Sequence, residues 1–161
     1  MSLESVRAWL AAHAPDLPLI EAHASTATVD DAARALGVEP ARIAKTLAVR
    51  AGDTFLLVTR GDARLDNAKC KARFGNRPRM LGADETFAVT GHPVGGVCPF
   101  GLATKLPVYL DISLRSFDLV YPAAGSRNSS VEIAPERLAG LVATDWVDLC
   151  RSPDDLSAAP S

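Results

Sequence analysis

The chain has 161 residues, a formal net charge of −2 at pH 7, 48% hydrophobic residues and 22% charged residues. This is an ordinary composition for one globular domain, and the acidic balance excludes an overall basic surface that wraps nucleic acid. No apolar run approaches the ~20 residues of a membrane span, and the three cysteines and three histidines show no spacing typical of zinc ligands. We therefore expect a cytoplasmic protein that holds no metal or cofactor.

The first third of the chain alternates short helices and strands. Apolar residues at helical spacing predict a helix over 2–13, and a proline-containing segment at 17–22 predicts a short edge strand. A helix begins at Thr28, a residue type that caps helices, and ends at Gly37. Residues 46–59 predict a β-hairpin around a glycine turn.

The remainder intermixes strands and helices without a regular βαβ order, which predicts an α+β fold with a curved mixed β-sheet flanked by helices. A single domain is expected over 1–150, with a loose C-terminal tail at 151–161. The further expected elements are helices over 65–74, 84–89 and 135–141, and strands over 80–81, 108–114, 117–121, 131–133 and 146–149.

Residues 28–47 imitate a helix-turn-helix, which makes a nucleic-acid-binding module the alternative function. The would-be recognition helix offers only Arg42 and Lys45 as long basic side chains, and it runs directly into a β pattern. A DNA partner is therefore not expected, and a non-catalytic tRNA-binding module remains open.

Lys45 shares a strand face with Leu47 and Val49 if the hairpin strand begins that early. A lysine on an apolar face is unfavourable unless it has an anionic partner or reaches solvent. The pattern leaves both possibilities open.

Basic residues concentrate between Arg60 and Arg79, a stretch that contains seven basic and only two acidic residues. In an acidic chain this concentration favours a polyanionic partner over a merely solvated face. The residues expected to contact such a partner are Arg60, Lys69, Lys71 and Arg73.

The segment 90–102 contains four of the chain's 11 glycines and two of its 11 prolines. Neither a helix nor a central strand tolerates that density, and the spacing is not that of a phosphate-binding loop. A loop this bare of side chains lets backbone N–H groups approach a ligand. We expect a substrate-binding loop whose exit is fixed by Pro99.

Two nucleophile arrangements can be drawn around this loop. Cys98 with His92 would form a thiol pair, and a serine at 126, 129 or 130 with His92 would form part of a triad. Nothing in the sequence orients His92, and no GxSxG turn is present. A small apolar role for Cys98 is the commoner case.

Lys45-Thr46-Leu47 opens the hairpin, Thr90-Gly91 precedes the 95–101 loop, and Leu106-Pro107 and Asp111 follow it. Three landmarks occur in a specific order: the lysine, the GxxxP loop at 95–99, and a Gly-Ser-bearing loop before Val131-Glu132-Ile133. Together they resemble the YbaK and prolyl-tRNA-synthetase-associated editing domain family, over roughly 22–149. The resemblance implies a deacylase that hydrolyses, in trans, the ester of a mischarged aminoacyl-tRNA, typically tRNA for proline. Prolyl-tRNA synthetase is an implied second partner, and no cofactor or metal is implied.

The resemblance also implies roles for particular residues. Backbone N–H groups of the 95–99 loop would polarise the ester carbonyl, and Lys45 would hold the terminal adenosine or its phosphate. Water, a ribose hydroxyl or the substrate's own side chain would attack, so no protein nucleophile is needed. The implied catalytic residues are Lys45, Gly95, Gly96, Val97, Cys98 and Pro99, and the implied substrate-binding residues are Thr46, His92, Phe100, Gly101, Gly125, Ser126, Asn128 and Ser129.

Two residues depart from the cysteine-specific branch of that family. An aromatic residue follows the Thr-Gly pair there and a serine precedes the loop proline, whereas this chain has His92 and Cys98. The loop near Ser126 also differs. We therefore expect alanine, 2-aminobutyrate, serine or threonine, rather than cysteine, to be the amino acid removed.

Overall fold

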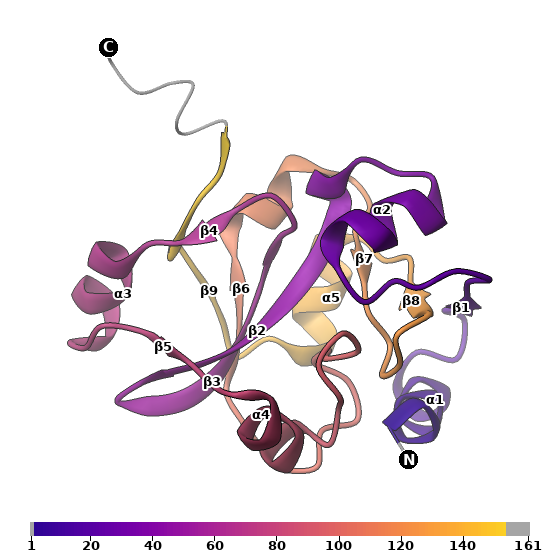
Figure 1. Cartoon of the computed structure of the whole chain (residues 1–161), viewed down its shortest axis with the longest axis horizontal. Helices are drawn as coiled ribbons and strands as arrows, with labels where there is room; N and C mark the ends of the chain where they lie inside the picture. Colours follow the sequence, from indigo (N-terminus) through magenta and orange to yellow (C-terminus); the bar gives the residue numbers. More distant parts are fainter. Residues whose placement is uncertain (1, 154–161) are drawn as a thin grey trace.

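The computed structural model of the protein describes residues 2–153. A mixed β-sheet runs through the middle of the molecule, with helices and loops on both faces (Figure 1). The α+β prediction is therefore confirmed. The helices are α1 (Ser2–His13), α2 (Val29–Leu36), α3 (Asn67–Phe74), α4 (Ala83–Thr90) and α5 (Pro135–Val142), with 3₁₀ turns at Pro40–Arg42 and Ile112–Ser116.

The central sheet has the strand order β5-β2-β3-β6-β9, and β7 also pairs with β2. Strands β2 and β3 are antiparallel, whereas β6 is parallel to both β3 and β9. These strands are β2 (Ile43–Ala51), β3 (Asp53–Arg60), β5 (Arg79–Met80), β6 (Val108–Asp111), β7 (Tyr121–Pro122) and β9 (Asp145–Val147). Two-stranded ribbons join β1 (Leu19–Glu21) to β8 (Ser129–Val131) and β4 (Arg64–Leu65) to β10 (Cys150–Arg151).

One edge of β2 is only partly covered. Strand β7 pairs with Ile43 and Ala44, and β5 pairs with Val49 and Arg50. The Ala48 carbonyl accepts from the Leu81 N–H at 3.0 Å, so residues 45–47 are the part of this edge without a strand partner. This opening positions the candidate site.

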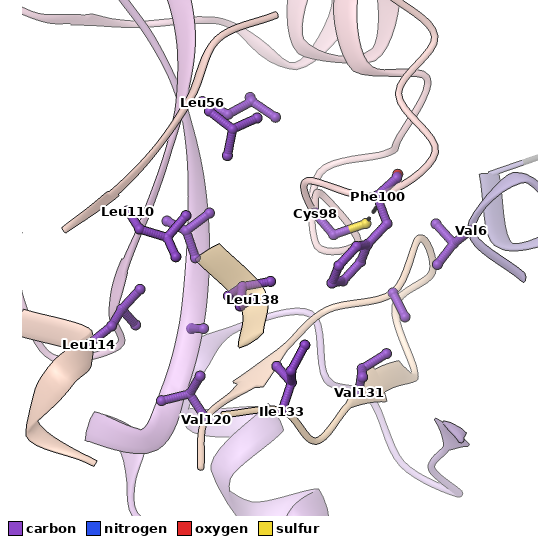
Figure 2. Packing of buried hydrophobic residues seen from close by; sticks show 14 of the residues in the cluster. Val6, Leu56, Cys98, Phe100, Leu110, Leu114, Val120, Val131, Ile133 and Leu138 are labelled. Atoms are coloured by element: carbon purple, nitrogen blue, oxygen red, sulfur yellow. Dashed lines mark hydrogen bonds between the residues drawn. The ribbon is translucent and has the colours of Figure 1, made fainter. Parts of the chain in front are cut away.

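Both faces of the sheet are buried. On β3, Leu56 and Val58 join one apolar cluster, while Phe55 and Leu57 join another on the opposite face. A strand buried on both sides is a continuous apolar run, which is why β3 shows little alternation in its sequence. Figure 2 shows the larger cluster, in which Phe100 lies between the sheet and α1.

Most predicted elements are present within one or two residues of their expected ends. Helix α2 begins as the Thr28 cap requires, since the Thr28 hydroxyl accepts from the Asp31 N–H at 3.0 Å. It ends at Gly37, whose φ of 69° is the left-handed conformation that glycine adopts without strain.

The prediction of long strands at 108–114 and 117–121 is wrong. Strand β6 ends at Asp111, whose carboxylate accepts from the Ser113 N–H at 3.0 Å and starts a 3₁₀ turn. Strand β7 contains only two residues. Beyond β6, Leu114 of the 3₁₀ turn is buried in the core, whereas Ile112 is exposed.

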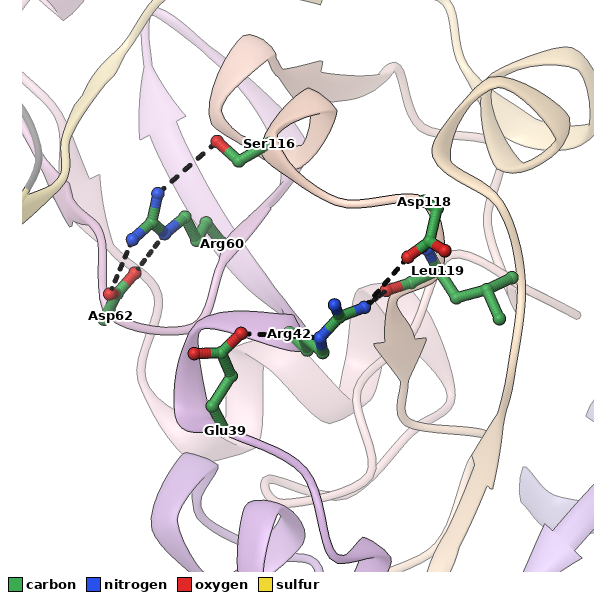
Figure 3. A network of polar contacts seen from close by, with 7 residues as sticks. All are labelled: Glu39, Arg42, Arg60, Asp62, Ser116, Asp118 and Leu119. Carbon is green, nitrogen blue, oxygen red and sulfur yellow. Dashed lines mark hydrogen bonds and ion pairs between the residues drawn. The ribbon is translucent and has the colours of Figure 1, made fainter.

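The helix-turn-helix interpretation of residues 28–47 is also wrong. After α2 the chain makes a single 3₁₀ turn at Pro40–Arg42 and enters β2 at Ile43. There is no second helix in this segment to enter a groove of DNA. Arg42 instead binds Asp118 at 3.0 Å (Figure 3). Its guanidinium carbon also lies 4.8 Å from the centre of the Phe117 ring.

The boundary expected between domain and tail needs a small correction. Arg151 pairs with Arg64 in the β10–β4 ribbon, and Ser152 is buried. The fold therefore continues past residue 150. The rest of the expected tail, residues 154–161, lies outside the described residues.

Candidate active site

A cavity of about 260 Å³ opens beside the uncovered part of β2. Residues 43–48 form one wall, and residues 26–29 form another. Val94, Gly95 and Val97 of the glycine-rich loop close a third side. The sequence landmarks at Lys45-Thr46 and in the glycine-rich loop therefore meet at one place in the fold.

Glycine is required in this loop because other backbone lies against it. A Cβ atom on Gly96 would lie 2.8 Å from the backbone nitrogen of Ser126, closer than atoms pack. Gly95 has a φ of 95°, and its Cβ would lie 3.0 Å from the Cβ of Ala27. The loop is thus pressed between the 26–29 wall and the 125–126 turn.

The loop's backbone donors are not equivalent. The Gly96 N–H donates to the Pro93 carbonyl at 2.9 Å, so it is used within the loop, and Pro99 has no N–H. The N–H groups of Gly95 and Val97 have no acceptor among residues 2–153, and both residues line the cavity. Within residues 95–99 these two are the N–H groups best placed to bind a ligand oxygen, and Gly96 and Pro99 have supporting roles; the Val94 N–H also has no acceptor and lies at the cavity.

Cys98, His92 and Phe100 point away from the cavity, into the core behind the loop (Figure 2 shows Cys98 and Phe100). All three are 0% exposed. The expectation that His92 and Phe100 contact substrate directly is therefore not supported by their positions. Gly101 also faces backwards, because a Cβ there would lie 2.7 Å from the Ser5 carbonyl oxygen of α1.

Neither proposed nucleophile is activated. Cys98 Sγ lies 3.6 Å from His92 Nε2, so the thiol and the imidazole are in contact, but both are fully buried. Burial raises the pKa of the Cys98 thiol to about 12, so it is protonated at neutral pH. The two ring nitrogens of His92 lie 2.5 Å from Ser2 Oγ and 2.7 Å from the Phe100 carbonyl oxygen. Burial lowers the pKa of His92, and Ser2 and the Phe100 carbonyl leave it no ring nitrogen for a serine at 126, 129 or 130.

The 125–129 turn supports the loop from the outside. The Gly125 N–H donates to the Gly96 carbonyl at 3.1 Å, and the Ser126 hydroxyl contacts Ser129 Oγ at 2.7 Å. The Asn128 side chain donates to the Ala22 carbonyl at 3.2 Å. These residues, expected to bind substrate, instead hold the turn in shape, and Ser130 beyond them lines the cavity.

Lys45 is half-buried in the cavity wall, and its ammonium donates to the Ala63 carbonyl at 2.5 Å. No carboxylate among residues 2–153 forms an ion pair with it, and burial lowers its pKa. The lysine is thus held in the wall by a neutral carbonyl rather than by an anion. The ammonium lies on the sheet face opposite Thr46, because adjacent residues of a strand alternate.

Sequence reasoning missed Thr26 and Arg127 near the cavity, and it considered Ser130 only as a possible nucleophile. The backbone N–H of Thr26 donates to the Arg127 carbonyl, and the Arg127 guanidinium in turn donates to the Val94 carbonyl at 3.3 Å. Ser130 and Thr26 both line the cavity. No motif or periodicity marks these positions, because strand pairing between β1 and β8 brings their segments together.

The basic stretch separates into a buried and an exposed part. Arg60 is 6% exposed and binds Asp62 through two hydrogen bonds of 2.6 and 3.0 Å (Figure 3). Its guanidinium is thus used inside the protein, which argues against a tRNA contact. On α3, Lys69 pairs with Asp148 and Arg73 with Asp145, while the exposed Lys71 has no partner in the described part of the chain.

Within residues 2–153, no helix has the length and apolar character to cross a bilayer. In the same residues, no three His, Cys, Asp or Glu side chains are grouped so as to hold a metal ion.

Comparison with known proteins gives consistent matches. Residues 23–141 match the family model of the aminoacyl-tRNA editing domain. The chain is 46% identical over 154 residues to "Uncharacterized protein YwhH" of Bacillus subtilis, covering 94% of this chain and 98% of that protein. It is 31% identical to the "Putative Cys-tRNA(Pro)/Cys-tRNA(Cys) deacylase EbsC" of Enterococcus faecalis, covering 76% of each chain.

A solved structure described as "a putative trans-editing enzyme for prolyl tRNA synthetase" superposes with a TM-score of 0.85 at 31% identity. The superposition covers 94% of this chain and 98% of that one. Both the sequence match and the fold therefore lead to the same conclusion: the chain belongs to the aminoacyl-tRNA editing domain family.

Proposed function

We propose that this protein hydrolyses the ester bond of a mischarged aminoacyl-tRNA in trans, with tRNA for proline carrying a small non-proline amino acid as substrate. The observation that carries the proposal is the cavity beside β2, where the N–H groups of Gly95 and Val97 have no acceptor within residues 2–153. Family membership and the names of EbsC and of the superposed structure support the same reaction.

In the proposed reaction the ester carbonyl oxygen accepts hydrogen bonds from Gly95 and Val97. These donors are fixed by the loop before substrate arrives, so they stabilise the negative charge that develops on that oxygen. A water molecule adds to the carbonyl carbon and gives up a proton, the ester C–O bond breaks, and the departing ribose oxygen takes a proton. Where a ribose hydroxyl or the substrate's own side chain adds first, the acyl group moves to that atom, and water must then cleave the new bond to release the amino acid.

Lys45 is proposed to hold the terminal nucleotide through its phosphate. An ammonium has three N–H donors, and the described structure uses one of them, on the Ala63 carbonyl. A half-buried cation without a carboxylate partner gains most from an anionic ligand. The exposed cations of α3 would contact the tRNA backbone farther from the ester.

A deacylation panel tests the function. Purified protein is mixed with tRNA charged separately with alanine, 2-aminobutyrate, serine, threonine, cysteine and proline, and the released amino acid is measured. We expect release of at least one small amino acid, sparing of proline, and no loss of activity in EDTA. Binding of every charged tRNA without hydrolysis would instead establish a tRNA-binding module. Addition of prolyl-tRNA synthetase tests whether that enzyme is a partner.

A further inference from the structure

The backbone of Thr46 points toward the uncovered edge of β2. In a β-strand every second residue turns its N–H and C=O groups to the same side. The Ala48 carbonyl accepts from the Leu81 N–H at 3.0 Å, on the side of β5. Thr46 lies two residues before Ala48, so its N–H and C=O groups point to the same edge.

The neighbouring strand gives the same direction. The Leu56 N–H of β3 donates to the Pro107 carbonyl at 2.9 Å, on the side of β6. Val58, two residues later, faces the same way, and it is the residue opposite Thr46 in the register. Thr46 and Val58 therefore form a pair that exchanges no hydrogen bonds. Within residues 2–153 the Thr46 N–H and C=O groups have no hydrogen-bond partner.

The unpaired edge of Thr46 lies at the cavity. Leu81 directly follows β5 and Ala123 directly follows β7, the two short partners of β2, and both residues line the cavity as Thr46 does. The cavity thus opens where the two partners stop, and Gly95 and Val97 line it as well. Backbone groups in folded proteins are nearly always paired, with protein or with water. A donor and an acceptor that the protein leaves unpaired at a cavity wall are therefore available to a polar ligand.

The lining of the cavity indicates which substrate group this acceptor suits. The α-amino group of an aminoacyl ester donates hydrogen bonds, but no acidic residue lines the cavity in the described part of the chain. Two nearby carbonyls are already used, because the Ala48 carbonyl accepts from Leu81 and the Val94 carbonyl accepts from Arg127 at 3.3 Å. The Thr46 carbonyl has no such donor, so an α-amino group can replace water there.

We propose that the Thr46 carbonyl accepts a hydrogen bond from the α-amino group of the substrate, while Gly95 and Val97 bind the ester carbonyl oxygen. This inference rests on the proposed deacylase function and deepens it by adding a positioning residue. The aminoacyl group is then held at both its nitrogen and its carbonyl, which fixes the carbonyl carbon for attack.

This contact disfavours proline through its nitrogen as well as through its ring size. A neutral primary α-amino group carries two hydrogens, whereas the secondary nitrogen of proline carries one hydrogen and a ring carbon. Because the ester carbonyl is already fixed by the glycine-rich loop, the group cannot rotate freely to turn its remaining hydrogen toward Thr46. A carbon on the nitrogen would then meet the strand edge at the short distance that a hydrogen bond requires.

The experiment compares pairs of isomeric substrates in which one methyl group lies on carbon or on nitrogen. The pairs are alanyl- with N-methylglycyl-tRNA, and 2-aminobutyryl- with N-methylalanyl-tRNA, each corrected for hydrolysis without protein. We expect kcat/KM for the N-methyl isomer to be at least about tenfold lower in each pair. N-acetylalanyl-tRNA, whose nitrogen is blocked, should be hydrolysed at least as poorly.

A backbone change in the protein tests the acceptor itself. Replacing Leu47 with its α-hydroxy acid turns the Thr46 carbonyl into an ester carbonyl, which is a weaker acceptor, and removes the Leu47 N–H that faces β3. The same change at Val49 is the matched control, because it also removes an N–H that faces β3 but weakens the Ala48 carbonyl, which Leu81 already binds. We expect similar losses of Tm, but a loss of kcat/KM for alanyl-tRNA that is about three- to tenfold greater at Leu47. The preference for alanyl- over N-methylglycyl-tRNA should shrink only in the Leu47 protein.

Each alternative outcome has a definite meaning. Equal rates within both isomeric pairs overturn the contact while leaving the deacylase function intact, because exclusion would then depend on size alone. Rapid hydrolysis of N-acetylalanyl-tRNA overturns it in the same way. Equal losses of kcat/KM in the Leu47 and Val49 proteins also overturn it, since the Thr46 carbonyl would then have no special role. Hydrolysis of no charged tRNA overturns the function and the contact together.

Discussion

The Nε2–H of His92 donates to the carbonyl oxygen of Phe100 at 2.7 Å and ties the two ends of the glycine-rich loop together. The carbonyl can only accept, which places the hydrogen on Nε2 and leaves Nδ1 to accept from the Ser2 hydroxyl of α1. The imidazole of His92 thus connects the glycine-rich loop to α1 through two hydrogen bonds. The protonation of this buried imidazole should therefore affect the free energy of unfolding.

Stability should fall as the pH drops below about 6.5, because His92 is buried as the neutral imidazole and its pKa is lowered. Below the unfolded-state pKa the unfolded chain binds a proton that the native protein resists, so unfolding becomes easier, by up to about 1.4 kcal/mol per pH unit. Urea unfolding at pH 7.5 and 5.5 measures this. His92→Asn should show a smaller change with pH, and the exposed His13→Asn should behave as the natural protein does. Equal pH dependence in all three would contradict the assignment.

Cys98→Ser should retain hydrolysis within about tenfold. The thiol is fully buried, has a pKa of about 12, and lies 3.7 Å from the Phe100 carbonyl, to which a serine hydroxyl can also donate. Rates of amino-acid release and labelling by a thiol reagent provide the check, and the native protein should resist labelling at this position. A fall of about three orders of magnitude would mean that the thiol is a nucleophile after all.

Lys45→Met should leave stability nearly unchanged while hydrolysis falls by about two orders of magnitude or more. The substitution removes a half-buried charge that has no carboxylate partner within residues 2–153, so little native-state stabilisation disappears beyond the bond to Ala63. Lys45→Arg should not restore activity, because a planar guanidinium does not replace a compact ammonium. Chemical unfolding and single-turnover kinetics are compared with Lys71→Met as control. A large drop in stability with normal kinetics would make Lys45 structural.

Replacing Lys69, Lys71 and Arg73 with alanine should weaken tRNA binding and flatten its salt dependence. The log–log slope should change by about 0.7–0.9 for each phosphate that the variant no longer neutralises. The surface ion pairs that Lys69 and Arg73 make within the protein are weak enough to be exchanged for phosphate. Arg7→Ala is the control, since α1 and α3 lie at opposite ends of the molecule (Figure 1). Identical slopes in the variant and the natural protein would mean that this face of α3 does not contact tRNA.

Local signals predicted most of the fold. The Thr28 cap and Gly37 bounded α2 correctly, because capping is decided by neighbouring residues. The alternation at 108–114 misled, since Asp111 turned the chain by accepting from Ser113, a competition that periodicity does not register. Strand ends are therefore less predictable than strand positions.

The candidate site was predictable in its location but not in the direction of its side chains. The sequence motif placed the glycine-rich loop beside Lys45 and Thr46, as the structure does. The motif did not predict that the side chains of His92 and Phe100 point toward α1. A loop has no periodic pattern of apolar residues from which buried and exposed side chains can be distinguished. Nor could the motif predict that Arg60 is bound by Asp62, because burial of a charged residue depends on the whole fold.

Helix α1 contributes no residue to the cavity lining, yet it lies directly against the loop that forms one of its walls. Cβ atoms on Gly101 and Gly125 would collide with the Ser5 and Ser2 carbonyls of this helix, and Ser2 also holds His92. The N–H groups of Gly95 and Val97 change position only when the structure behind the loop shifts. Directed evolution toward other amino acids would therefore accumulate substitutions in this N-terminal helix, and an affinity tag joined in front of Ser2 would disturb substrate preference more than one joined to the other end.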